Sequence, residues 1–323
     1  MAQDLIQDIP LWKPSATLEM LQKRALVMAK IRQFFNQRGY LEVETPILGH
    51  YGVTDVYLSN IQAYFRGKPY SLQTSPEYHM KRLLAAGSGP IYQLARVFRD
   101  DELGRWHNPE FTLLEWYQLG INHHELMEEM DAFLQSILNC SSMRKMTYRD
   151  AFKNACGLDP FEANLEDFQH YLAHENLGTV LEVDETDRDQ YLFLLMSHRV
   201  EPYLAQLHQP IALYDFPASQ ASLAKVNAEV AERFEIYFKG VELANGFHEL
   251  VDAESQRLRF EEDRAKRKAL GLSLPKPDPN LLAALESGLP ACSGVALGVD
   301  RLLALLLEEP AISNVLAFDI ARA

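Results

Sequence analysis

The chain has 323 residues, of which 47% are hydrophobic and 24% are charged. This is enough apolar material for one large domain or two ordinary ones, and no repeat or low-complexity tract is visible. The formal net charge of −14 disfavours wholesale binding of tRNA or DNA, because nucleic-acid binders usually present a basic face. The sequence leaves a local basic patch open, but it predicts a globular protein that binds neither tRNA nor DNA.

Cysteine usage and the N-terminal residues indicate a cytoplasmic protein. Cys140, Cys156 and Cys292 are odd in number and widely spaced, which argues against a disulfide framework or a cysteine zinc site. No basic segment followed by an apolar run opens the chain, so no signal peptide is expected. No stretch of 18 apolar residues is present, so no membrane span is expected either.

The first elements alternate between helix and strand. Apolar residues at intervals of three and four predict a helix over 17–38. Residues 41–48 alternate like a strand, although Pro46 restricts them to an edge or a strand end. Two strands around a turn are expected within 56–74, and a short helix over 76–86.

Two further strands are predicted at 91–99 and 110–119, joined by a polar loop. Asn122 then caps a helix, with Glu125 in the reciprocal position of a capping box. The predicted buried stripe of this helix consists of Leu126, Met130, Phe133 and Ile137.

In the second half, residues 164–208 are predicted to be mostly helical and residues 234–251 to return to strand. A charged helix over 256–270, a proline-rich loop over 272–280 and an apolar helix over 300–308 follow. Strands and helices do not alternate strictly, which predicts an α+β fold with a largely antiparallel β-sheet flanked by helices. No linker is visible, so we expect one domain over 17–323 after a short extension, 1–16.

The segment 242–249, Glu-Leu-Ala-Asn-Gly-Phe-His-Glu, combines two carboxylates with an amide and a ring. It follows a β-branched and aromatic run, and carboxylates at the end of a core strand cost free energy unless a cation compensates them. We interpret it as a site for Mg²⁺ and an amine, the alternative being a solvated turn after an edge strand. Alternation puts Glu242 and Glu249 on opposite faces, and a bulge at Gly246 would realign them.

The stretch 97–117 is the second candidate site. Arg99 and Asp101 share one strand face, and so do the alternate residues that begin at Phe111 and end at Tyr117. That face offers a ring for stacking at one end and the carboxylate of Glu115 with a phenol at the other. An arginine fork suits a phosphate. The alternative is a surface hairpin with ion pairs.

A third stretch, 293–301, holds Gly298, which permits close backbone approach, and Arg301 at the start of an apolar helix. A glycine and an arginine are weak evidence alone, and a structural arginine is the plainer interpretation. The three stretches become specific together.

In order and spacing they resemble the three signature motifs of class II aminoacyl-tRNA synthetases, over about residues 17–320. Phe-Arg…His-Asn-Pro-Glu-Phe, Glu-Leu-Ala-Asn-Gly-Phe and Gly-Val-Asp-Arg are most similar to lysyl-tRNA synthetases. Those enzymes carry an N-terminal OB-fold domain for the anticodon, for which the residues before the first helix leave no room. A catalytic domain of this kind resembles the elongation factor P–(R)-β-lysine ligase family.

The resemblance implies an ATP-dependent, AMP-forming ligase that activates (R)-β-lysine, or lysine, and transfers it to a lysine of elongation factor P. It also implies a homodimer with 17–46 at the interface. A short enzyme that lysylates tRNA or another small acceptor and an inactive regulatory paralogue are the alternatives.

For the nucleotide, the resemblance implies that Arg99 holds the α-phosphate, and that Arg301 grips the γ-phosphate side and covers the adenine opposite Phe111. Glu242 and Glu249 would bind Mg²⁺. The remaining residues of the implied ATP site are Asp100, Asp101, His107, Asn108, Leu243 and Gly298.

For the amino acid, the resemblance implies that Ser75, Pro76 and Glu77 bind substrate, with Glu77 on the backbone amine. Phe247 would form an apolar wall. The residues implied to hold the side-chain ammonium are Glu115, Tyr117, Asn245 and Glu249.

Two positions depart from the lysyl-tRNA synthetase pattern. Asp101 stands where the pattern has glutamate, which lengthens a direct adenine contact or inserts a water. Ala296 stands where glycine is usual. One extra methyl in a tight pocket is worth about 1–3 kcal/mol of discrimination, so we hypothesise that Ala296 favours β-lysine over α-lysine. The group that deprotonates the acceptor lysine is not assigned.

Overall fold

The computed structural model describes residues 10–100, 103–178, 180–181 and 185–323. Its centre is a 9-stranded sheet in the order β1-β5-β6-β12-β11-β10-β8-β7, with β9 on β10. Neighbouring strands run antiparallel except for the pairs β1–β5 and β7–β8, so the predicted α+β class is confirmed. The strands are β1 Leu41–Glu42, β5 Ile91–Phe98, β6 Glu110–Leu119, β7 Arg144–Thr147, β8 Ile211–Pro217, β9 Val226–Asn227, β10 Val230–Phe238, β11 Val241–His248 and β12 Cys292–Gly298.

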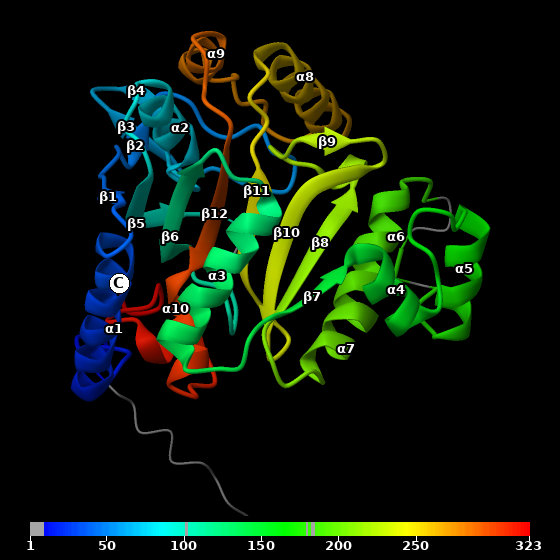
Figure 1. The fold of residues 1–323 in the computed structure, drawn as a ribbon, viewed down its shortest axis with the longest axis horizontal. Coiled ribbons are helices and arrows are strands. Elements are labelled where there is room, and N and C mark those ends of the chain that lie inside the picture. Colours follow the sequence, from blue (N-terminus) through cyan, green and yellow to red (C-terminus); the bar gives the residue numbers. More distant parts are fainter. Residues whose placement is uncertain (1–9, 101–102, 179, 182–184) are drawn as a thin grey trace, which may run out of the picture.

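One face of this sheet is covered by α1 (Leu18–Asn36), α3 (His123–Leu138) and α10 (Val299–Leu306). Figure 1 shows α3 crossing in front of the sheet, with α1 along its edge. The four residues of the predicted stripe of α3 are all buried, and Asn122 forms the predicted capping box with Glu125. This core consists largely of aromatic and long aliphatic side chains, whose burial is worth about 1.5–3 kcal/mol each.

A second group of helices packs beside β8 and β10 and forms its own apolar core: α4 Tyr148–Cys156, α5 Leu165–His174, α6 Arg188–Leu195, a π-helical turn Met196–Val200 and α7 Glu201–Ala205. A third core joins α2 (Glu77–Ala85), α8 (Ala253–Ala269) and α9 (Pro279–Glu286) to the sheet. A 3-stranded sheet contains β2 Leu48–Gly49, β3 Gln62–Phe65 and β4 Lys68–Leu72.

The predicted strand over 41–48 is wrong in its extent. Residues 43–47 form no regular strand between β1 and β2, consistent with the missing N–H of Pro46. The strand β12 and the helices α4 and α9 were not predicted as elements.

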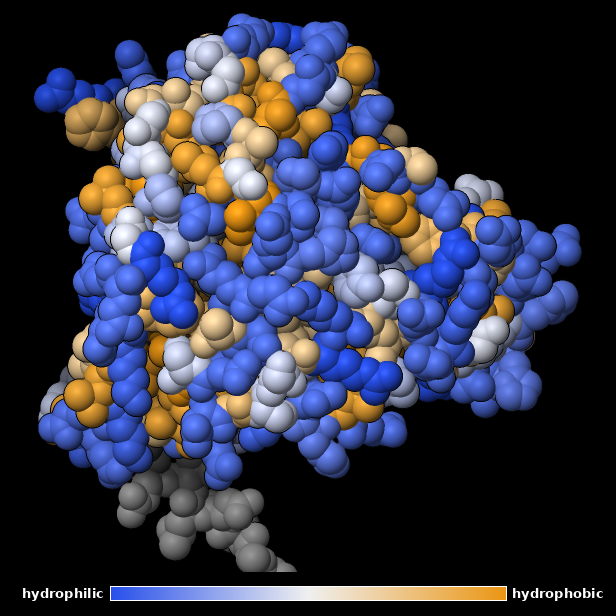
Figure 2. All heavy atoms as spheres, viewed as in Figure 1, coloured by the Kyte–Doolittle hydropathy of each residue, from blue (hydrophilic) through white to orange (hydrophobic). Residues whose placement is uncertain are grey.

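Hydrophilic side chains cover most of the face shown in Figure 2, with hydrophobic patches between them. Within the part of the chain that is described, no helix is long and apolar enough to cross a membrane.

Candidate active site

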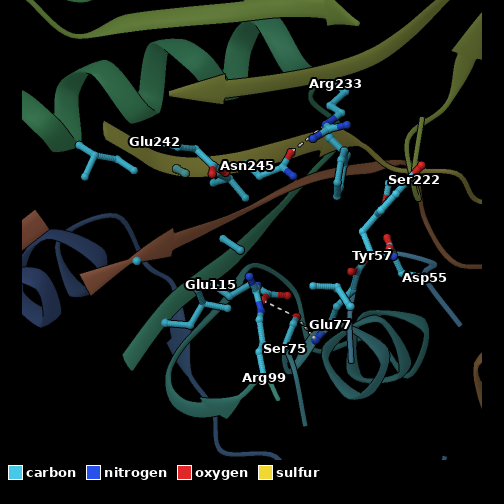
Figure 3. A pocket seen from close by; sticks show the side chains of 18 of the residues that line it. Asp55, Tyr57, Ser75, Glu77, Arg99, Glu115, Ser222, Arg233, Glu242 and Asn245 are labelled. Atoms are coloured by element: carbon cyan, nitrogen blue, oxygen red, sulfur yellow. Dashed lines mark hydrogen bonds between the residues drawn. The ribbon is translucent and has the colours of Figure 1, made fainter. Parts of the chain in front are cut away.

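A cavity of about 570 Å³ opens on the sheet and is lined by residues of β6, β11, β12, the start of α2 and the segment that joins β5 to β6. Figure 3 shows Glu77, Glu115 and Arg99 on one side of the cavity. Glu242, Asn245 and Arg233 lie on the opposite side. Phe111, Leu113, Glu115 and Tyr117 all line it, which confirms that these alternate residues share a face.

Most predicted site residues meet in this cavity. Pro76 and Asp100 do not line it, and Asp101 lies outside the described residues. The predicted residues that do line it are Ser75, Glu77, Arg99, His107, Asn108, Phe111, Glu115, Tyr117, Glu242, Leu243, Asn245, Phe247, Glu249, Ala296, Gly298 and Arg301.

Glu115 is the central buried carboxylate. Its side chain accepts hydrogen bonds from the hydroxyls of Ser75 and Tyr117, both at 2.7 Å. Burial, and then the negative charge of Glu77, raise its pKa to about 8, although the two hydrogen bonds act in the opposite direction. A carboxyl held close to neutrality in this way is poised to ionise when a cation enters.

Lys81 connects two further carboxylates and was missed by the sequence analysis. Its ammonium lies 2.6 Å from a carboxylate oxygen of Glu77 and 2.7 Å from one of Glu249, and its side chain is 2% exposed. Burial and the charge of Glu77 raise the pKa of Glu249 to about 7, against the opposing effect of Lys81. The signal in the sequence was the spacing of four residues between Glu77 and Lys81 on one helix.

Gly294, not Gly298, is where backbone and side chains approach closely. A Cβ on Gly294 would lie 2.2 Å from Cε1 of Tyr117 and 2.6 Å from Oε1 of Glu249. A Cβ on Gly298 would meet only the side chain of Arg301, at an ordinary 3.7 Å. Glycine at 294 therefore lets the Tyr117 ring and the Glu249 carboxylate lie against β12.

The bulge in β11 lies at Leu243 rather than at Gly246. Ile236 pairs with Ala244 and Tyr237 with Glu242, so Leu243 is the extra residue. The bulge resets the alternation, and both Glu242 and Glu249 line the cavity. Gly246 instead lies under a ring, because a Cβ there would be 2.4 Å from Cζ of Phe234.

Arg301 also lines the cavity and is held in place there. Its guanidinium donates to the carbonyls of Trp106 at 3.1 Å and Glu242 at 2.8 Å, and lies 2.6 Å from Nε2 of His107. The Glu242 carboxylate is 3.5 Å away. Arg99 lies with its guanidinium carbon 5.1 Å from the centre of the Phe111 ring.

Asn108 and Asn245 are fixed by hydrogen bonds. The Asn108 amide donates to the carbonyl of Glu110 and accepts from the amide of Ile320, so it shapes the loop before β6. Asn245 accepts a hydrogen bond of 3.2 Å from Arg233, a cavity residue that the sequence analysis missed. Nothing in the single strand pattern of β10 distinguished Arg233 from a surface arginine.

The cavity thus combines two chemically different kinds of group. The carboxylates of Glu77, Glu115 and Glu249 line it together with the guanidinium groups of Arg99 and Arg301, and arginine forks suit phosphate oxygens. Such a cavity can hold an ammonium and a polyphosphate together and bring a carboxylate of one ligand to a phosphorus of the other.

Comparison with known proteins agrees with this arrangement. The family model described as tRNA synthetases class II (D, K and N) matches residues 9–322. The elongation factor P–(R)-β-lysine ligase of Vibrio vulnificus is 53% identical over 95% of this chain and 97% of its own length. The ligases of the same name from Vibrio cholerae and Klebsiella pneumoniae are 51% and 50% identical, each over 97% of this chain and 98% of the relative. The chain belongs to the class II (D, K and N) tRNA synthetase family.

Proposed function

We propose that this protein is an ATP-dependent, AMP-forming ligase that activates (R)-β-lysine and transfers it to a lysine side chain of elongation factor P. The observation that carries the proposal is one cavity that is lined both by the buried carboxylates of Glu115 and Glu249 and by two arginines, Arg99 and Arg301. The names of the relatives that share at least half of the residues support the substrates. A reaction that uses ATP and a translation factor runs in the cytoplasm.

The amino acid carries two ammonium groups and one carboxylate. We propose that Glu115, Tyr117, Asn245 and Glu249 bind the side-chain ammonium and Glu77 the second amine, with Phe247 as an apolar wall. Ser75 supports this geometry by hydrogen bonding to Glu115. A buried carboxylate is stabilised when a cation pairs with it. This supports the group of carboxylates around Glu115 as the ammonium site.

In the first step, an oxygen of the substrate carboxylate attacks the α-phosphorus of ATP, the bond to the bridging oxygen breaks, and pyrophosphate leaves. The nucleophile is already ionised, so positioning and charge stabilisation suffice. We propose that Arg99 holds the α-phosphate, and that Arg301 holds the γ-phosphate side and covers the adenine opposite Phe111. His107 supports Arg301, and Asn108 supports the loop.

The carboxylate of Glu242 fits a Mg²⁺ ligand. It lines the cavity, and its side chain is 38% exposed. Burial, and then the negative charge of Glu242, raise the pKa of the neighbouring Glu201 carboxyl to about 7. A bound Mg²⁺ would neutralise phosphate charge. Glu249, the second proposed Mg²⁺ ligand, already pairs with the ammonium of Lys81. We therefore assign its carboxylate to the substrate ammonium before the metal.

In the second step, the amine of the acceptor lysine attacks the acyl carbon of the adenylate, forming an amide and releasing AMP. The acceptor amine must lose a proton before it attacks. We propose that residues 17–323 form the one catalytic domain that performs both steps. A single sheet whose strands lie between Leu41 and Gly298 supports this.

The proposed reaction is tested first by ATP–pyrophosphate exchange, with Ala296 as the specificity probe. Ala296 pairs with Glu115 on one side and Asn245 on the other, so its methyl lies between two proposed ammonium ligands. Ala296→Gly is expected to shift the β-lysine to α-lysine ratio of kcat/KM toward α-lysine by about 10–200-fold. An unchanged ratio in Ala296→Gly would refute the role of Ala296. No exchange by the wild type with either amino acid would refute the proposed function.

Binding of the amino acid is expected to release protons. Glu115 and Glu249, with pKa values of about 8 and about 7, are largely protonated below these values, while an ammonium binds the ionised form. Affinity for (R)-β-lysine should therefore rise with pH, by about tenfold per pH unit for each proton released, between about pH 6 and pH 8. Calorimetry in buffers of different ionisation enthalpy measures this release. Equal heats in all buffers and a flat pH profile would contradict it.

We also propose a homodimer with residues 17–46 at its interface. Leu18 and Leu26 on α1 and Leu41 on β1 are exposed apolar side chains in this region. Light scattering at working concentration is expected to give twice the mass of the chain. A monomer would refute the dimer and leave the cavity assignments untouched.

A further inference from the structure

A second cavity, of about 400 Å³, lies at the N-terminal end of α3 and is also lined by residues of β10 and β11. Strand alternation turns His248 away from Phe247 and Glu249, which line the active-site cavity, so His248 faces this second cavity instead. The second cavity also receives the side chains of His123 and Glu232. None of these three residues contributes to the proposed ligase reaction.

His123 is buried without a hydrogen-bonding partner. It is 5% exposed, and neither of its ring nitrogens forms a hydrogen bond with the residues that the structure describes. The closest acidic oxygen, Oδ1 of Asp215, is 3.4 Å from Nε2. Leaving a buried donor or acceptor unsatisfied costs about 1–3 kcal/mol. The buried imidazole, without a hydrogen bond to either ring nitrogen, therefore points to a ligand-binding role for this cavity.

The local strand geometry gathers carboxylates around this imidazole. The pairing of β8 with β10 shifts register between Ala231 and Phe234, so that Asp215 stands opposite two residues, Glu232 and Arg233. Asp215 has a φ of 60°, which a non-glycine residue rarely adopts. Bulges of this kind redirect side chains, and here Asp215 and Glu232 both line the cavity.

We propose that His123, Glu232 and His248 bind a divalent transition metal of the zinc type, with Asp215 as a supporting carboxylate. One ligand atom from each of the three residues lies within 4.8 Å of the other two. Two imidazoles and one carboxylate, leaving a position for water, are a ligand set that zinc commonly accepts. The Glu232 carboxylate already contacts Nδ1 of His248. The other ring nitrogen of His248, Nε2, is then the atom that would coordinate the metal.

The charges around the cavity favour a cation on balance. Asp215 and Glu232 contribute two negative charges, and Lys225 contributes one positive charge. The partial positive charge at the start of α3, where His123 lies, amounts to about half a charge and offsets only part of this negative balance. A bound ion would tie α3 to β11, the strand that also carries Asn245 and ends just before Glu249, and so would stabilise the fold rather than take part in the reaction.

The test uses untagged full-length protein dialysed against a chelator and then titrated with Zn²⁺, and with Co²⁺ as a spectroscopic probe. Wild type is expected to bind one Zn²⁺ per chain with a rise in melting temperature. Loss of a supporting carboxylate costs metal sites about 10–100-fold in affinity, which is the expected result for Asp215→Asn. His248→Asn and Glu232→Gln, which remove ligands, are expected to lose at least about 100-fold. His174→Asn, at an exposed histidine, is the control and should bind as wild type does.

Three results would overturn the proposal. The first is no stoichiometric binding by wild type. The second is unchanged binding by the His248→Asn/Glu232→Gln double variant. Loss of binding in His124→Asn alone would move the ion to the neighbouring group of His123, His124 and Asp215 and so would refute the ligands proposed here. Circular dichroism and thermal melting without metal distinguish a lost ligand from a lost fold.

Discussion

Arg99→Ala is expected to lower kcat/KM for ATP–pyrophosphate exchange by about 10²–10³-fold, the usual cost of removing one donor that stabilises developing charge. The guanidinium lines the cavity beside the Phe111 ring, and its planar fork suits a phosphate. Arg99→Lys should recover little of the loss, because an ammonium cannot reproduce the planar fork. Exchange kinetics with (R)-β-lysine at saturating ATP provide the measurement.

The matched control is Arg257→Ala, which removes a half-exposed arginine of α8 that pairs with Glu286. It should leave exchange within about twofold of wild type, since exposed ion pairs contribute about 0–1 kcal/mol. Full exchange activity in Arg99→Ala, with the control also active, would remove Arg99 from the reaction.

Lys81→Met is expected to destabilise the fold by about 3–5 kcal/mol, because it leaves the buried carboxylate of Glu249 and the partly buried carboxylate of Glu77 without their cation. It should also abolish productive binding of (R)-β-lysine, since the ammonium site would lose its geometry. Urea denaturation followed by circular dichroism measures the stability. Adding Glu249→Gln to Lys81→Met should restore part of it by removing one of the two stranded charges.

The comparison variant is Lys23→Met on α1, where the same residue type pairs with an exposed glutamate four positions away. Its free energy of unfolding should change by no more than about 0.5 kcal/mol. Equal effects of the two substitutions would show that Lys81 is not the buried counter-ion described here.

The strand periodicity and the motifs predicted much of the cavity. Alternation from Phe111 to Tyr117 correctly assigned four residues to one face, because β6 is a regular strand paired on both sides. It failed for β11, where the extra residue is Leu243 and not Gly246. A bulge depends on how two strands pair, and that pairing is not encoded in either strand alone.

The residues missed were those whose role depends on long-range contacts. Lys81 reaches Glu249 across 168 positions of the chain, and Gly294 is required because of Tyr117. His123 was assigned to no site, although it is one of two adjacent histidines after a helix cap. Its significance came only from the fold, which buries it and brings Glu232 and His248 to it.

The most direct test of the proposed function is intact-mass analysis of elongation factor P after incubation with this protein, ATP, Mg²⁺ and (R)-β-lysine. The expected result is a mass increase of one β-lysyl group, absent without ATP and formed about 10²–10³-fold more slowly with Arg99→Ala. A parallel reaction with tRNA should give no aminoacylated product. Unmodified elongation factor P, or label transferred to tRNA instead, would contradict the proposed acceptor.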